Sequence, residues 1–125
     1  MAKTETFSGR SVSIDDPCCE PLHSIVGLEL CSQFMLMFEV HLSNGHTVRA
    51  FKHRITREYL HVDRTEPGLA YLYTDTGRYR RVDPSSALIA VFRGLWPLVA
   101  KDEAEQTWQL LNLALDRLET SPAPA

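Results

Sequence analysis

The residues best suited to binding chemistry are tyrosines and arginines in the middle of the chain. Side chains of an extended strand alternate between the two faces of a sheet. This alternation predicts an apolar face of Leu60, Val62, Ala70, Leu72 and Val82. It predicts an opposite face with Tyr59, His61, Tyr71, Tyr73, Tyr79 and Arg81. From this face and its arginine neighbours, the predicted binding residues are Tyr71, Tyr73, Tyr79, Arg80, Arg81 and Arg54.

Such a Tyr/Arg face is typical of two functions. Tyrosine rings can stack on the bases of single-stranded nucleic acid, at about 1–3 kcal/mol per base, while arginine forks match phosphate oxygens. The same residue types anchor protein–protein interfaces. A structural interpretation is also available, because tyrosine commonly lies half-buried on a sheet. If the C-terminal helices cover this face, the tyrosines belong to the core.

A second candidate for chemistry is the thiol cluster of Cys18 and Cys19, with His23 and Cys31 nearby. Three cysteines do not form an even disulfide framework, and the paired spacing of a zinc site is missing. We therefore expect reduced thiols, as in cytosolic proteins. A thiol- or metal-dependent enzyme centred on Cys18 and Cys19 is the weaker alternative.

No other motif indicates catalysis. The five histidines form no HxH or HxxxH pair within one predicted element, and no glycine-rich phosphate loop occurs. Asp102, Glu103 and Glu105 are explained by the start of a helix, where carboxylates are favoured. We therefore expect a non-enzymatic protein without a cofactor or a metal.

The predicted strands are arranged as hairpins. Phe34 to Leu42 alternates clearly, which places Phe34, Leu36, Phe38, Val40 and Leu42 on one face. Asn44-Gly45 predicts a two-residue type I′ turn, in which Phe38 faces Phe51 and Glu39 faces Ala50. A second hairpin, over 69–74 and 78–82, surrounds Asp75-Thr76-Gly77 and fits a type I turn with a glycine bulge.

Two helices are predicted after the sheet. Asp83-Pro84 is a good helix start, and Asp102 with Glu105 resembles a capping box that opens the second helix. Its predicted buried stripe is Ala104, Trp108, Leu111, Leu115 and Leu118. Leu110 and Leu113 lie outside that stripe, so this helix is apolar on two sides. A second apolar side favours contact with another subunit, such as a homodimer.

The segment Leu22–Cys31 fits both a strand and a helix, and Gly27 inclines the prediction towards a strand, since glycine costs a helix about 1 kcal/mol. Residues 1–20 are expected to form a partly mobile arm, and residues 121–125 a disordered tail. The prediction is therefore one α+β domain over residues 21–120. It has an antiparallel sheet of five or six strands, followed by two helices packed on one face.

Composition is consistent with a globular protein. Of 125 residues, 44% are hydrophobic and 23% are charged. The net charge of −3 conceals a basic middle, because residues 45–81 contain 8 Lys/Arg and 4 Asp/Glu. The polar N-terminus lacks an apolar signal core, so we expect a cytoplasmic protein that does not enter a membrane. The expected function is binding of a protein partner or a second copy, with nucleic-acid binding as the alternative.

Overall fold

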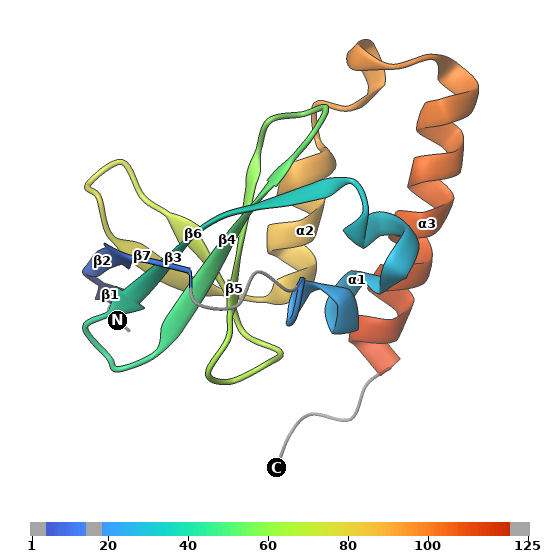
Figure 1. The fold of residues 1–125 in the computed structure, drawn as a ribbon. Helices are drawn as coiled ribbons and strands as arrows, with labels where there is room; N and C mark the ends of the chain where they lie inside the picture. Colours follow the sequence, from blue (N-terminus) through green and yellow to red (C-terminus); the bar gives the residue numbers. More distant parts are fainter. Residues whose placement is uncertain (1–4, 15–18, 121–125) are drawn as a thin grey trace.

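The computed structural model describes residues 5–14 and 19–120, and it is an α+β fold. Seven antiparallel strands form one sheet in the order β1-β7-β6-β5-β4-β3-β2. Their bounds are Thr6–Phe7, Gly9–Val12, Phe34–Leu42, Thr47–His53, Tyr59–Asp63, Ala70–Tyr73 and Tyr79–Val82 for β1 to β7. The helices are α1 (Leu22–Cys31), α2 (Pro84–Phe92) and α3 (Lys101–Thr120), with a 3₁₀ turn, η1, at Trp96–Leu98. Figure 1 shows the three α-helices together on one side of the sheet.

The prediction of five or six strands was wrong because β1 and β2 lie within the segment predicted as an arm. Thr6 and Phe7 pair with β7 at one edge of the sheet, and residues 9–12 pair with β3 at the other edge. Only Ser8 separates the two short strands. The sheet therefore curls until its edges meet around this segment, which leaves it nearly barrel-like and protects both edges. Residues 1–4, 15–18 and 121–125 lie outside the described part of the chain.

The β3–β4 hairpin differs from its predicted turn. The Leu42 N–H donates to the His46 carbonyl at 2.8 Å, so these two residues still pair and the loop has three residues, 43–45. The Gly45 N–H donates to the Leu42 carbonyl at 3.0 Å, and Gly45 has a φ of +90°. The extra loop residue shifts the register by one, so Phe38 faces Ala50 and Glu39 faces Arg49.

A register shift at Met37 then changes the side on which β3 presents its residues. Leu36 pairs with Phe51, whereas Phe38 pairs with Ala50, so Met37 is an extra residue. Leu36 consequently packs in the helix-side core, and Phe38 packs with the cluster on the opposite face. The single apolar face predicted for β3 was therefore wrong, because a bulge inverts the alternation.

The segment Leu22–Cys31 is a helix and not a strand. Leu22, Ile25, Val26 and Leu30 are all buried, which is a helical stripe. The helix is interrupted at Gly27, whose φ of +85° and ψ of 165° are not helical. The ambiguous pattern thus comes from two short helical pieces joined at one glycine.

Two helices follow the sheet, and α2 begins at the predicted Asp83-Pro84, whereas α3 begins at Lys101, so Asp102 lies in its first turn and does not cap it. The Asp83 carboxylate caps α2 by accepting a hydrogen bond from the Ser86 N–H at 3.1 Å. In α3 the most buried residues are Ala104, Thr107, Leu111 and Ala114. Trp108 was expected in this stripe but is 39% exposed. The buried side is therefore rotated away from Trp108, which contacts Trp96 of η1 with ring centroids 6.0 Å apart.

Two apolar cores lie on the two faces of the sheet. The larger one packs the helices on the sheet, and its most buried members include Leu22, Phe51, Leu88, Phe92 and Leu111. The smaller one fills the curl of the sheet, with Phe7, Val40, Leu42, Val48, Tyr71 and Tyr79. Within the described residues, no helix has the length and apolar character needed to span a membrane.

Candidate binding sites

The predicted Tyr/Arg face lies inside the curl of the sheet. Tyr71 and Tyr79 are buried, with exposures of 0% and 5%, whereas Tyr73 is 57% exposed. The helices do not cover these tyrosines; Phe7 and the apolar residues of β3 and β4 do. Of the three predicted tyrosines, only Tyr73 is therefore available to a partner.

Of the three predicted arginines, one lies beside a predicted tyrosine and two do not. Arg81 is beside Tyr71 in the ladder and lies over its ring, with 5.9 Å from the guanidinium carbon to the ring centroid. Arg80 alternates to the opposite face, where it pairs with Leu72. Arg54 lies between β4 and β5, and its Nε donates to the Ser32 carbonyl at 3.2 Å. The six predicted residues thus do not form one surface.

Arg81 and Tyr71 belong to a hydrogen-bond network around a buried carboxylate. Asp63 is fully buried. It accepts hydrogen bonds from the Tyr71 hydroxyl at 2.7 Å and the Glu66 N–H at 2.8 Å, and it contacts His46 Nδ1 at 2.6 Å. The Tyr71 hydrogen bond is the main cause that raises the pKa of Arg81. These contacts satisfy Asp63 internally, so we assign it a structural role.

A second buried charge cluster joins β3 and β4 on the helix side. Arg49 is fully buried, and its Nε donates to Glu39 at 2.7 Å. Arg64 donates to the same Glu39 oxygen at 2.7 Å, and Arg49 Nη1 donates to the Glu20 carbonyl at 3.0 Å. Part of the basic middle of the chain is therefore consumed by internal pairing.

An aromatic pocket of about 510 Å³ opens where the curl of the sheet approaches the β6–β7 loop. Its lining residues are Ser11, Phe38, Glu58, Tyr59, His61, Leu72, Tyr73 and Tyr79. The sequence pattern placed four of these rings on one face, and it missed Phe38, which the bulge brings to this side.

His61 is a buried lining residue of this pocket and contacts four of its aromatic rings. Its ring centroid is 5.3 to 6.5 Å from those of Phe38, Tyr59, Tyr73 and Tyr79. The residue is 6% exposed, and its Nδ1 has no hydrogen-bond partner among the described residues. Burial lowers the pKa of His61 to about 4, so the imidazole is neutral at pH 7.

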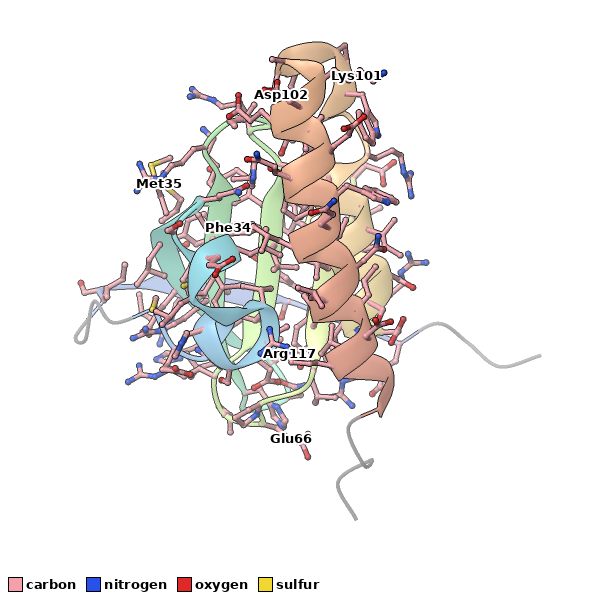
Figure 2. The ribbon with its side chains drawn as sticks, turned by 90° about the vertical axis from the view of Figure 1, so that its right-hand side faces the viewer. Phe34, Met35, Glu66, Lys101, Asp102 and Arg117 are labelled. Carbon is pink, nitrogen blue, oxygen red and sulfur yellow. The ribbon has the colours of Figure 1, made fainter. Side chains whose placement is uncertain are left out.

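A second pocket, of about 350 Å³, lies between α1 and α3 on the outer side of the helices. It is lined by Val26, Gly27, Leu28, Glu29, Leu30, Leu110, Leu113 and Arg117. Leu28 and Leu113 are 72% and 62% exposed, which are the two largest exposures among the large apolar residues that the structure describes. Figure 2 shows Arg117 between the two helices. We call these eight residues the helix groove.

The structure describes two of the three cysteines of the thiol cluster. Cys18 lies outside the described residues, Cys19 is exposed and Cys31 is buried, and both described thiols are free. Burial is the main cause that raises the pKa of Cys31 to about 12. His23 Nδ1 contacts the Glu20 carboxylate at 3.0 Å. In the described part of the chain, no group of three or more His, Cys, Asp or Glu residues could hold a metal ion.

Comparison with known proteins gives no relative. No protein-family model matches the chain, and no curated protein or solved structure matches it significantly.

Proposed function

We propose that this protein is a non-enzymatic, cytoplasmic binding module that acts through protein–protein contact, and that its partner is a second copy of itself. The observation that carries the proposal is the exposure of Leu28 and Leu113, which both line the helix groove. Large apolar side chains grouped at the surface favour association, because water is released when they are covered.

The helix groove suits a symmetric dimer. A two-fold interface is self-complementary, since the same surface patch is used on both subunits. Packing of two helix grooves would bring Leu28 and Leu113 of both copies together. Glu29 and Arg117, which have opposite charges, line the same groove and would lie at the interface in each copy. Charged groups in an interface fix its register more than its affinity.

The expected affinity is moderate. Burial of one leucine side chain contributes about 1.5–3 kcal/mol, and a symmetric dimer covers Leu28 and Leu113 twice. Association itself costs about 4–15 kcal/mol in lost freedom of motion. The two contributions are similar in size, so we expect a dimer that dissociates on dilution.

Sedimentation equilibrium over a range of concentrations tests this proposal. We expect a mass of twice 14.2 kDa that falls towards the monomer on dilution. Leu113→Lys should abolish the dimer. Ile89→Lys is a matched control, because Ile89 is also an exposed apolar residue (41%) but lies on α2, outside the helix groove. A monomeric wild type, or equal effects of both substitutions, would contradict the proposal.

The alternative, single-stranded nucleic-acid binding on the Tyr/Arg face, has weaker support. Stacking requires accessible rings, and Tyr71 and Tyr79 are buried. Tyr73, Arg80 and Arg81 are exposed, which would leave one tyrosine with arginines on different faces. Binding of an oligonucleotide that weakens with salt and with Tyr73→Ala would favour this alternative.

A further inference from the structure

The aromatic pocket on the curled face of the sheet is a second site, separate from the helix groove. We infer that it binds a small neutral aromatic molecule that carries a hydroxyl group able to hydrogen-bond to His61. The inference rests on the rings that line the pocket, on its size and on the imidazole of His61, which has no hydrogen-bond partner among the described residues.

The lining favours an aromatic ligand. Phe38, Tyr59, Tyr73 and Tyr79 surround a pocket of about 510 Å³, which lies within the ordinary range of about 300–1,000 Å³ for small-molecule sites. Aromatic rings pack preferentially on other rings in offset or edge-to-face arrangements. The rings of the pocket already show this preference, since Tyr73 and Tyr79 meet edge to face with centroids 4.9 Å apart.

His61 indicates which kind of polar group the ligand carries. Buried polar atoms in folded proteins nearly always have hydrogen-bond partners, and His61 Nδ1 is an exception among the described residues. A neutral imidazole has one nitrogen that donates and one that accepts. A hydroxyl can satisfy either nitrogen, because it is both a donor and an acceptor. Because Nδ1 is itself buried, a ligand in the open pocket would meet the other ring nitrogen, Nε2, and its hydroxyl would hydrogen-bond there.

The pocket favours a neutral ligand over a cation. Aromatic boxes often bind ammonium groups, and Glu58 lines the rim, so a cation is the main competing interpretation. However, His61 offers the pocket a neutral hydrogen-bonding nitrogen, which a hydroxyl can use. A quaternary ammonium has neither a donor nor an acceptor for it, so the imidazole favours the hydroxyl-bearing neutral ligand.

Binding of four probes to the 125-residue protein tests this inference. They are p-cresol, toluene, cyclohexanol and benzyltrimethylammonium, with affinities measured by ligand-observed NMR titration. We expect p-cresol to bind about tenfold more tightly than toluene, because tenfold corresponds to about 1.4 kcal/mol and one hydrogen bond to the imidazole can contribute this much. Tighter binding of the cation, equal binding of p-cresol and toluene, equal binding of p-cresol and cyclohexanol, or no saturable binding would overturn the inference.

Two variants test whether the probe binds in the aromatic pocket. His61→Phe should remove the preference for p-cresol over toluene, and Tyr73→Ala should weaken both probes severalfold. Leu113→Lys lies in the helix groove and should change neither affinity, which separates this site from self-association. If His61→Phe does not fold, the imidazole nitrogen shifts of the wild type replace it. They should move on addition of p-cresol and not of toluene, and unchanged shifts would overturn the inference.

Discussion

Tyr71 shows at the scale of one residue how burial decides between a binding role and a structural role. Its hydroxyl donates to the buried Asp63 carboxylate at 2.7 Å, and its ring is fully covered. The residue type and the strand alternation are the same for Tyr73, which is exposed. The difference comes from β1, β3 and β4, which cover only one of the two positions.

This assignment predicts the effect of Tyr71→Phe. Removal of the hydroxyl deprives a buried carboxylate of one donor, so the free energy of unfolding should fall by about 1–3 kcal/mol. Urea denaturation measures the change. Tyr73→Phe is the matched control, because Tyr73 is exposed, and it should change stability by less than about 0.5 kcal/mol. Equal effects of the two substitutions would contradict the structural role of Tyr71.

The buried histidines predict a loss of stability in mild acid. Burial lowers the pKa of His53 and of His61 from 6.5 to about 4. His53 Nδ1 also accepts hydrogen bonds from the Ile55 and Thr56 N–H groups at 3.2 and 3.1 Å, which requires this nitrogen to be unprotonated. The unfolded chain therefore binds these protons at a higher pH than the folded chain does.

Linkage then fixes the sign of the pH dependence. The stabilisation is complete above pH 6.5 and is lost as the pH falls towards about 4. Each histidine accounts for up to about 3 kcal/mol, at about 1.4 kcal/mol per pKa unit. Urea denaturation at several pH values measures this loss, and His61→Phe should reduce its size. Stability that does not change over this range would refute the assignment.

At the scale of the elements, local patterns predicted the hairpins but not the contacts between distant segments. The β6–β7 turn has the predicted geometry, with Gly77 at φ +79° and its N–H bonded to the Thr74 carbonyl at 3.0 Å. The bulge at Met37 was not predictable from alternation, since it is fixed by pairing with β4. The strands β1 and β2 were missed because two to four residues contain no periodic signal.

The break in α1 predicts a specific effect of Gly27→Ala. Gly27 has a φ of +85°, and an added Cβ would lie 2.8 Å from Arg117 Nη2. The arginine tip can move, but the positive φ remains unfavourable for alanine, so unfolding free energy should fall by about 1–3 kcal/mol. Gly94→Ala is the control, because nothing lies within 4 Å of the added Cβ. Thermal or urea denaturation that shows no difference between them would exclude this conformation of α1.

The closure of the sheet predicts the effect of Gly9→Ala. An added Cβ at Gly9 would lie 2.4 Å from Val40 Cγ1 and 2.9 Å from a ring carbon of Tyr79. The contact would push β2 away from the small core, at a cost of about 1–3 kcal/mol. Relative to the wild type, hydrogen exchange in the variant should become faster in β1 and β2 and change less in β4 and β5. Unchanged exchange at residues 6–12 would mean that the sheet is not closed by this segment.

At the scale of the whole molecule, the sequence predicted two functional features that the structure separates. The Tyr/Arg face was expected to be one binding surface, but its tyrosines are divided between the small core and the aromatic pocket. The second apolar side of α3, indicated by Leu110 and Leu113, lines the helix groove together with Leu28. The partner element was not predictable, because α1 was expected to be a strand.

Self-association through the helix groove is the central claim, and contacts between two copies test it most directly. A dimer mixed from isotope-labelled and unlabelled chains permits NMR detection of contacts between copies only. We predict intermolecular contacts from the methyl groups of Leu28 and Leu113, and their loss in Leu113→Lys. Intermolecular contacts confined to other residues, such as Leu98 or Ile89, or no such contacts at concentrations where the mass is that of a dimer, would contradict the claim.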